Sequence, residues 1–459
     1  MNKFLERIPD DVKSLAKLFR EDGYSIYLVG GCVRDLLMGR EPHDWDMCTD
    51  ATPLQMKYIC RKANMFHTRV GEEHGTITFY PNDVGYEITT FRIDGDYSDG
   101  RHPDEVQFTT SLEADLARRD LTINAMALDP ETGELIDPHG GAQDICRMRI
   151  AAVGSAEKRI EEDALRMPRA IRFAIAYGFM IDADLVIAIR NHVKDIDKVS
   201  KERVTEEFRK IFATGKPVGP YFNMFSDLIT TVIPELQPCV GFNQNNKYHK
   251  HNVYEHLLAV VDLCQSNKFE IKMAALLHDI GKPAMYEEDE AGQGHFYGHP
   301  AKSAEICKTL LAQRFRLTRE ETSRILELVE FHDKDIAPTV KSVRRALCKH
   351  GEDFMNDWFI LKQADMDDHI YPDDKYPQTV APLIPIMMQI LDDNMAFSLK
   401  DLHITGNLIM STLGLKQGKI IGVILNRLLE EVIDEKLENT GAALITRAEE
   451  ILKEENGND

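Results

Sequence analysis

The sequence predicts an α+β protein in which a mixed α/β domain is followed by helices alone. Between residues 24 and 150, short β-type runs are separated by helical segments. After Val153 the apolar residues recur every three or four positions to the end of the chain, as in amphipathic helices. A chain of 459 residues is about three times the common domain size, so we expect several domains.

The order of elements follows from these patterns. Four runs predict strands in the mixed domain: YSIYLVG, GTITFY, YEITTFR and MRIAAV. Three helical runs come next: KRIEEDALRMPRAIRFAIAYG, ADLVIAIRNHVKDI and ERVTEEFRKIFATG. A polar stretch at 241–247 and a break at 371–380 divide the rest. We therefore place domain boundaries near residues 150, 240 and 370.

The composition is that of a globular protein with no stretch suited to a membrane. Hydrophobic residues make up 43% of the chain, and no apolar run approaches the about 18 residues that span a bilayer. The first residues include Glu6, Asp10 and Asp11, where a secretory signal would be basic and then apolar. We expect a cytoplasmic protein that contacts no membrane. The eight cysteines form no CxxC pair, and we expect them to be reduced.

The charge distribution points to one region for a polyanionic ligand. The formal net charge of −21 makes broad adsorption to nucleic acid unfavourable. Residues 157–216, however, carry 13 Lys and Arg against 11 Asp and Glu. We expect a polyanion to bind to this segment.

A glycine turn follows the first predicted strand. The run LVGGCVRDLLMG predicts a strand, a turn at Gly30 and Gly31, and a helix. Glycines let the backbone approach a ligand closely, and the start of a helix presents unpaired N–H groups. Such a turn suits a triphosphate, although many turns of this kind are purely structural.

Two aspartates come next, at Asp44 and Asp46 in HDWDMC. In a strand, residues two apart lie on one face with Cα atoms roughly 6–7 Å apart. Two such carboxylates can hold Mg²⁺ between a triphosphate and an attacking hydroxyl, whereas a DxD alone is often a solvated acidic edge. The glycine turn and Arg34 just upstream favour the metal site.

These motifs carry a family resemblance. The runs GGCVRDLLMGREPHDWD, RRDLTINAMA at 118–127 and EDALRMPRAIRF at 162–173 resemble the class II tRNA nucleotidyltransferase and bacterial poly(A) polymerase superfamily. PEL at 234–236 and DLHITGNLIMSTLGLKQGKIIGVIL at 401–425 also resemble family segments. The resemblance implies a polymerase-β-like nucleotidyltransferase head with a mixed sheet over 1–150. It also implies all-α domains: a neck over 151–240, an HD domain over 245–370 and a tRNA-binding tail over 371–459.

The resemblance also implies roles for head residues. Asp44 and Asp46 would be catalytic ligands of Mg²⁺. The residues that would meet the triphosphate are Gly30, Gly31, Arg34, Arg119, Asp120 and Asn124. Glu87 in YEITTF is a possible third carboxylate, but only strand alternation supports it, and we leave it out of the predicted site.

The neck segment suggests how a base is chosen. Asp163, Arg166, Arg169 and Arg172 recur every three residues on one predicted helix. A carboxylate beside a guanidinium matches the donor and acceptor of cytosine and adenine, and it leaves groups of uracil and guanine unpaired. The resemblance implies this use, with Glu162 bracing Arg166. The same spacing also occurs in exposed ion pairs. We expect Pro168, inside that helix, to produce a kink.

A histidine and aspartate pattern follows in the second half. His256, His278, Asp279 and Asp365 match the pattern of the HD phosphohydrolase superfamily, with His299 as a further candidate. Imidazole and carboxylate groups together suit a divalent transition metal or Mg²⁺, which can make water nucleophilic near neutral pH. His332 is either another ligand or a surface histidine.

The predicted activity is template-independent addition of CCA to tRNA from CTP and ATP, with hydrolysis by the HD domain. Residues 91–108 resemble the head-domain loop of full CCA-adding members; Gly95 and Gly100 suit a mobile lid. The loop argues against a CC-only enzyme. Addition of A alone, poly(A) synthesis, or an HD phosphohydrolase with an RNA-binding head stay open as alternatives. Lys416 and Lys419 could meet tRNA phosphates, and no protein partner is evident.

Overall fold

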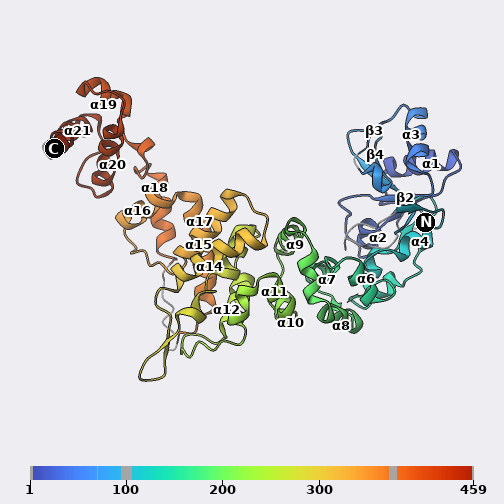
Figure 1. Cartoon of the computed structure of the whole chain (residues 1–459). Coiled ribbons are helices and arrows are strands. Elements are labelled where there is room, and N and C mark those ends of the chain that lie inside the picture. Colours follow the sequence, from blue (N-terminus) through green and yellow to red (C-terminus); the bar gives the residue numbers. More distant parts are fainter. Residues whose placement is uncertain (1–3, 70, 95–105, 372–379, 457–459) are drawn as a thin grey trace. The chain divides into compact units, whose positions relative to one another are not determined.

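The computed structural model describes residues 4–69, 71–94, 106–371 and 380–456. The chain divides into two compact units (Figure 1). One consists of Met1–Gln237 with Ala312–Arg316, and the other of Pro238–Leu311 with Leu317–Asp459. Among the described residues, no helix is both long and apolar enough to cross a membrane.

A seven-stranded mixed sheet forms the centre of the N-terminal part, as the sequence predicts. Its strand order is β3-β4-β5-β2-β1-β8-β9, and only β2 and β5 run parallel. The strands are β1 (Ile26–Val29), β2 (Met47–Thr49), β3 (Phe66–Thr68), β4 (Thr76–Tyr80), β5 (Tyr86–Thr90), β8 (Ala127–Leu128) and β9 (Leu135–Ile136).

Alternation along the central strands builds a core on each face of this sheet. Leu28, Met47 and Ile88 point into the larger core, which helices α1 (Asp10–Glu21) and α3 (Pro53–Lys62) share. The neighbouring strand residues Val29 and Cys48 point to the opposite face and pack with Leu116 of α4 (Leu112–Ala117). Further short elements are α2 (Gly31–Leu37), η1 (Glu72–His74), η2 (Thr122–Asn124) and α5 (Gly141–Cys146).

Two predictions for this domain need comment, the strand at MRIAAV and the loop over 91–108. The run MRIAAV contributes only β10 (Arg149–Ile150), which pairs with β11 (Met180–Ile181) outside the main sheet. The loop predicted over 91–108 begins with β6 (Arg92–Asp94) and ends with β7 (Val106–Phe108), which pair antiparallel. The predicted lid itself, residues 95–105, lies outside the described residues.

Helices follow from residue 156, as predicted, but the first long helix is broken in two. Its parts are α6 (Ala156–Glu162) and α7 (Arg166–Tyr177), with Asp163 extended between them. The later elements of this unit are α8 (Ala183–Asn191), η3 (Val193–Lys198), α9 (Lys201–Ala213), α10 (Gly219–Met224), α11 (Ser226–Val232) and η4 (Pro234–Cys239).

Pro168 accounts for the break, and the expected kink is wrong. Pro168 is the third residue of α7, and the first helical hydrogen bond runs from the N–H of Arg169 to the carbonyl of Leu165. The third residue of a helix has no carbonyl partner for its N–H, so proline loses nothing there. Beginning a new helix at Arg166 avoids the clash that a continuous helix would create.

The second unit is almost entirely helical and has two parts. The first contains α12 (Val253–Leu263), α13 (Phe269–Leu277), η5 (Lys282–Met285), β12 (Glu287–Glu288), β13 (Gly294–His295), α14 (His299–Arg314), α15 (Arg319–Phe331), α16 (Val340–His350) and α17 (Glu352–Asp368). The second contains α18 (Leu383–Asp392), η6 (Leu399–Asp401), α19 (Gly406–Leu413), α20 (Lys419–Ile433) and α21 (Gly441–Asn456). The elements from η6 to α21 enclose a hydrophobic core of their own.

Candidate active sites

The first candidate site is a cleft of about 760 Å³ in the N-terminal unit. All the head and neck residues that the sequence predicts for nucleotide and metal binding line it. They are Gly30, Gly31, Arg34, Asp44, Asp46, Arg119, Asp120, Asn124, Asp163, Arg166, Arg169 and Arg172. Nine basic and four acidic residues line this cleft, so its local charge is positive although the chain is acidic.

The two predicted metal ligands precede a strand instead of lying in one. β2 begins at Met47, which pairs with Leu28 of the antiparallel strand β1. Because β1 ends one residue later, at Val29, no residue of β1 is left to pair with Asp44. The segment is still extended at Asp46, whose carbonyl accepts a hydrogen bond from the N–H of Val29 at 3.0 Å. Both aspartates therefore still face the cleft.

Crowding of carboxylates makes this point of the cleft suited to a cation. Burial, Glu87 and Asp44 together raise the pKa of Asp46 to about 6, against the opposing effect of Arg119. Glu87 stands beside Asp46 because β2 and β5 are parallel and pair Met47 with Ile88. Strand alternation was the available signal for Glu87, and we left it out of the predicted site. A divalent cation would relieve this repulsion, so the oxygen donors fit Mg²⁺.

Both the backbone conformation at position 30 and the nearby side chain of Arg119 favour a glycine there. It has φ 74° and ψ −129°, a conformation that residues with a side chain rarely adopt. A Cβ atom on Gly30 would also lie 3.3 Å from Nη1 of Arg119. The glycine turn thus brings the backbone against an arginine of the cleft.

Arg34 is held rigidly at the floor of the cleft. Its guanidinium donates to Oδ1 of Asn124 at 2.6 Å and to Asp35 at 3.0 Å. It also lies over the rings of Tyr177 and Phe173, at 5.0 and 5.3 Å from their centroids. Asn124 therefore orients an arginine, which suggests a positioning role for it.

A buried aspartate that the sequence analysis did not identify holds two more arginines. Asp115 is 1% exposed and pairs with Arg118 at 2.9 Å and with Arg119 at 3.1 Å. Burial alone would raise the pKa of Asp115, but the two arginines lower it. The spacing of three and four residues in DLARR is the helical ion-pair pattern that would have revealed it.

Asp120 joins the head to α7. Its Oδ2 accepts from Nε and Nη2 of Arg169 at 2.9 and 2.6 Å. Burial would raise the pKa of Asp120, yet Arg169 and Arg166 lower it to about 2. Asp120 therefore positions Arg169 in the cleft, and its predicted contact with the triphosphate stays a prediction.

The predicted base-reading pair is not a pair on one helix. Asp163 lies at the end of α6 and forms a bidentate ion pair with Arg203 of α9, at 2.7 and 3.2 Å. Arg166 instead donates to Glu162 at 2.5 Å, which is the contact that we expected. Both residues line the cleft, but each has a partner of its own. Arg203 and Glu207, which binds Arg172 at 2.7 Å, were missed because α9 is distant in sequence.

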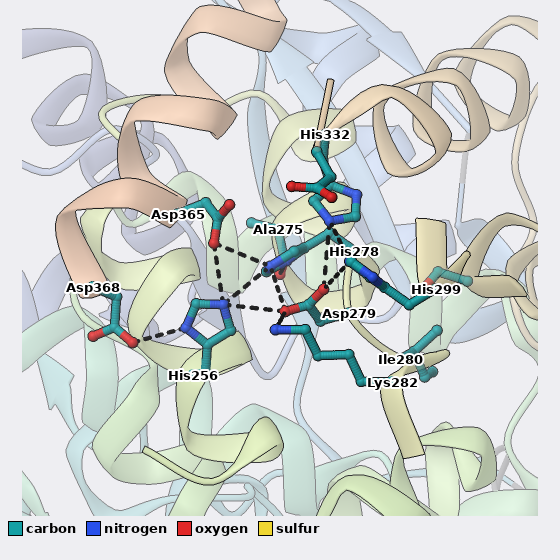
Figure 2. A network of polar contacts seen from close by, with 12 residues as sticks. His256, Ala275, His278, Asp279, Ile280, Lys282, His299, His332, Asp365 and Asp368 are labelled. Atoms are coloured by element: carbon teal, nitrogen blue, oxygen red, sulfur yellow. Dashed lines mark hydrogen bonds and ion pairs between the residues drawn. The ribbon is translucent and has the colours of Figure 1, made fainter. Parts of the chain in front are cut away.

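The second candidate site is a cluster of histidines and aspartates in the other unit (Figure 2). His256 lies on α12, His278 and Asp279 follow α13, and Asp365 lies on α17. Nε2 of His256 is 3.3 Å from Nε2 of His278, 3.3 Å from Oδ2 of Asp279 and 3.2 Å from Oδ1 of Asp365. The structure thus brings together the four residues that the sequence predicts as ligands.

A second group of ligands shares Asp279. Its other oxygen, Oδ1, lies 3.1 Å from Nε2 of His299 and 3.4 Å from Nε2 of His332. These contacts lack hydrogen-bond geometry, so this buried oxygen has no hydrogen-bond partner among the described residues. His332 is 2% exposed and is therefore not a surface histidine. Asp279 faces a possible cation position on each side.

The hydrogen bonds of the histidines fix which ring nitrogen is available. In all four, Nδ1 lies against an oxygen that can only accept, so Nδ1 carries a hydrogen and Nε2 is the nitrogen available to a cation. This tautomer is the one that metal-binding histidines adopt. The acceptors of His256, His278, His299 and His332 are Oδ2 of Asp368 and the carbonyls of Ala275, Phe296 and Val329, at 2.8, 2.9, 2.8 and 2.7 Å.

The charge state of the aspartates agrees with a cation site. Burial would raise the pKa of Asp279, but Lys282 and the surrounding histidines hold it well below its usual range. Although burial opposes it, the neighbouring carboxylates raise the pKa of His256 to about 10 and that of His278 to about 9, so a divalent ion would take the place of a proton at these nitrogens. The four Nε2 atoms and the carboxylates form two groups, one on each side of Asp279, a donor set that fits a divalent transition metal. A pocket of about 310 Å³ opens beside the cluster, lined by Asp279, His299, His332 and Asp365 among others.

Family models match four parts of the chain. They are the Poly A polymerase head domain over residues 26–151, the "Probable RNA and SrmB- binding site of polymerase A" over 178–239, the HD domain over 253–366 and tRNA nucleotidyltransferase domain 2 over 379–448.

One named relative matches over nearly the whole chain and another over part of it. The CCA-adding enzyme of Limosilactobacillus reuteri (strain DSM 20016) is 31% identical over 457 residues, which cover 98% of this chain and 99% of that protein. The CCA-adding enzyme of Bacillus pumilus is 48% identical over 191 residues, covering 42% of this chain and 46% of that enzyme.

Solved structures share the fold. The CCA-adding enzyme of Bacillus stearothermophilus in complex with CTP aligns with a TM-score of 0.71 at 24% identity, covering 98% of this chain and 100% of that one. The Thermotoga maritima CCA-adding enzyme complexed with tRNA-CCA aligns with a TM-score of 0.60 at 19% identity, covering 98% of each chain.

Proposed function

The chain belongs to the family of CCA-adding enzymes, and we propose that it adds C, C and A to the 3′ end of tRNA from CTP and ATP. The observation that carries this proposal is the cleft of about 760 Å³ in the N-terminal unit. It joins the carboxylates Asp44 and Asp46 to phosphate-binding arginines and to Asp163 and Arg166. The tail, with Lys416 and Lys419, is proposed to hold the tRNA, and the cytoplasm is the proposed location.

In the proposed reaction, the 3′-hydroxyl oxygen of tRNA bonds to the α-phosphorus of CTP or ATP while the bond to pyrophosphate breaks. Mg²⁺ on Asp44 and Asp46 supplies charge neutralisation and orientation for the two oxygens. Arg34 and Arg119 neutralise the departing pyrophosphate. Because each is already paired, to Asn124 and Asp115, it meets the phosphates without losing much side-chain freedom.

Base choice is proposed to lie with Asp163 and Arg166. Asp163 accepts from the exocyclic amine of cytosine or adenine, and Arg166 donates to the adjacent ring nitrogen. Uracil and guanine would leave these groups unpaired, at a cost of about 1–3 kcal/mol each. Arg203 holds the Asp163 carboxylate, so the base and Arg203 share the two oxygens of Asp163.

The deciding experiment uses tRNA that ends before CCA. It is incubated with CTP, with ATP and with both, and products are read at single-nucleotide resolution. We expect two additions with CTP alone and three with both. Addition only to tRNA that already ends in CC would show an A-adding enzyme. Long, salt-sensitive tails would show a poly(A) polymerase.

We propose in addition that the histidine cluster hydrolyses a phosphoester end such as a 2′,3′-cyclic phosphate. The specific observation is the set of four Nε2 atoms around Asp279. A divalent ion held there supplies a water that is nucleophilic near neutral pH. Lys282 lies 2.6 Å from Oδ2 of Asp279 and keeps this carboxylate ionised.

Metal analysis of the purified chain tests this second function. We expect up to two divalent ions per chain at the cluster, with Asp279 between them. His299→Ala and His332→Ala should each remove one ion and leave the other. If the protein binds no ion at the cluster and hydrolyses no cyclic phosphate with Mg²⁺, Mn²⁺, Co²⁺ or Ni²⁺, the hydrolase proposal is wrong.

A further inference from the structure

Tyr297 is placed next to the histidine cluster by a short hairpin. The strands β12 and β13 pair Glu287 with His295, and the chain then turns through Tyr297 and Gly298 into α14. Gly298 has φ 79°, which permits this turn. His299, a predicted ligand, is the first residue of α14. Only Gly298 separates Tyr297 from this predicted ligand, so their Cα atoms are at most about 7 Å apart.

The ring of Tyr297 is exposed on a fixed support. Tyr297 is 70% exposed, although large aromatic residues usually bury their rings. Its ring lies parallel to that of His295, with 5.4 Å between centroids and 4° between planes. Nε2 of His295 in turn lies 3.0 Å from Asp289, whose Oδ1 accepts the backbone N–H groups of Ala291 and Gln293 at 2.9 Å each.

The neighbouring aromatic residue behaves differently. Phe296 packs against Tyr286, with 5.6 Å between ring centroids, and lies under the ammonium of Lys282 at 5.3 Å. Phe296 therefore supports the cluster from within, whereas the ring of Tyr297 is left to the solvent. Core packing does not explain Tyr297.

Tyr297 and the cluster share one pocket. The walls of the 310 Å³ pocket include Tyr297, His295, Asp279 and His332. Two further wall residues, His249 and His369, have buried ring nitrogens, Nδ1 and Nε2 respectively, with no hydrogen-bond partner in the part of the chain that the structure describes. The pocket thus offers an aromatic face at its rim and unpaired polar atoms beside the ligands.

We propose that Tyr297 determines specificity in this pocket, with the base of the substrate nucleotide stacked on its ring while the phosphate lies at the cluster. The inference rests on the proposed hydrolase function and adds the residue that holds the base. Every base presents a flat face that stacks on an aromatic ring, and the ribose and phosphate oxygens can pair with His249 and His369. A phosphoester without a base would leave the ring of Tyr297 unused. The nucleotide is either free or the last one of an RNA.

The test compares Tyr297→Ala with the matched variant Tyr297→Phe in the full-length, metal-loaded protein. The substrates are adenosine 2′,3′-cyclic phosphate and the abasic ribose 2′,3′-cyclic phosphate. We expect Tyr297→Ala to raise KM for the adenosine ester about 10- to 100-fold and to leave the abasic ester unchanged, because only the base loses its stacking partner. Tyr297→Phe should behave like the wild type. Equal KM values for the adenosine ester in all three proteins would overturn the proposal.

A second set of measurements distinguishes a free nucleotide from the end of an RNA, and it tests the hydrolase function separately from the role of Tyr297. tRNA ending in a 2′,3′-cyclic phosphate should show the same dependence on Tyr297, and the larger kcat/KM identifies the natural source. If the wild type hydrolyses neither ester, the hydrolase function fails, and binding of adenosine 3′-monophosphate by calorimetry then decides the stacking. Tighter binding to the wild type than to Tyr297→Ala supports the nucleotide pocket, and equal binding excludes it.

Discussion

At the residue scale, the two sites hold charge in opposite ways. In the cleft, carboxylates crowd against one another at Asp46 while arginines are fixed by aspartates behind them. In the histidine cluster, the Nε2 atoms of four imidazoles surround the carboxylate of Asp279. Each arrangement has unmet electrostatic demand that a cation satisfies.

Asp46→Asn should reduce nucleotide addition by at least about 100-fold, because it removes an anionic oxygen from the proposed Mg²⁺ site. The variant should fold. The raised pKa of Asp46 means that its charge opposes folding above about pH 6, so a neutral side chain should not lower the melting temperature in the absence of Mg²⁺. Addition assays and thermal unfolding with and without Mg²⁺ check both points. Near-normal addition would remove the assignment.

Asp163→Ala should relax base choice by about 10- to 100-fold against UTP and GTP, since the exocyclic amine loses its acceptor. Arg203→Ala should act in the same direction but more weakly, because it frees the Asp163 carboxylate to rotate. The readout is the ratio of kcat/KM values for CTP and UTP. Arg209→Ala, on the same helix but not on the wall of the cleft, is the control. Unchanged ratios in both variants would show that the base is read elsewhere.

At the scale of elements, the break between α6 and α7 decides the geometry of the cleft. A continuous helix would hold Asp163 one turn from Arg166 on a single face. Ending α6 at Glu162 leaves Asp163 extended, where it reaches Arg203 of α9. The guanidinium of Arg166 then donates hydrogen bonds to residues of α6, namely to the carboxylate of Glu162 and to the carbonyl of Arg159. Two helix ends, instead of one helix face, present the proposed base-reading groups.

His192 provides a pH-dependent link among α6, α8 and η3. Its Nδ1 lies 2.7 Å from Asp195 and its Nε2 3.0 Å from Glu157, so both nitrogens face carboxylates. Burial would lower the pKa of His192, but the two carboxylates raise it. Since the folded state binds the proton more tightly, this contribution is complete below the unfolded pKa of about 6.5 and is lost as the pH rises through the folded pKa.

His192→Asn should therefore lower the free energy of unfolding by up to about 1 kcal/mol at about pH 6 and by less at about pH 9. Urea unfolding of both proteins at the two pH values measures the difference. Asn191→Ala is the matched control, because Asn191 also contacts Glu157 at 3.4 Å but does not titrate. A difference that does not depend on pH would mean that His192 contributes only through packing.

At the scale of the whole molecule, the two candidate sites belong to different compact units and share no residue. One chain thus carries a proposed transferase and a proposed hydrolase that act on the same kind of end. Removal of a damaged phosphate before nucleotide addition is a joint role that this arrangement permits.

Asp279→Asn should abolish binding of divalent ions at the cluster and hydrolysis of cyclic phosphate, and it should leave CCA addition within about twofold of the wild type, since no ligand is shared. Asp46→Asn should show the reverse pattern. Metal content and the two activities, measured on each variant, form a complete cross-check. Loss of both activities in either variant would show that the sites depend on each other.

The sequence alone predicted the fold class and most of the residues that line the cleft. Local patterns suffice there, because strand alternation, helical period and short motifs such as HDWD lie within a few residues of one another. The same holds for the four predicted ligands His256, His278, Asp279 and Asp365, which lie together in the structure. Their assigned roles stay predictions until the variants are measured.

Only the tertiary structure decided the partners of these residues. The ion pairs of Asp163 with Arg203 and of His256 with Asp368 join side chains that no local period brings together. The same reason explains the shared oxygen of Asp279 and the place of Tyr297 on the pocket wall. Packing of distant helices selects one neighbour among many polar residues, and that choice depends on distances that a linear pattern does not contain.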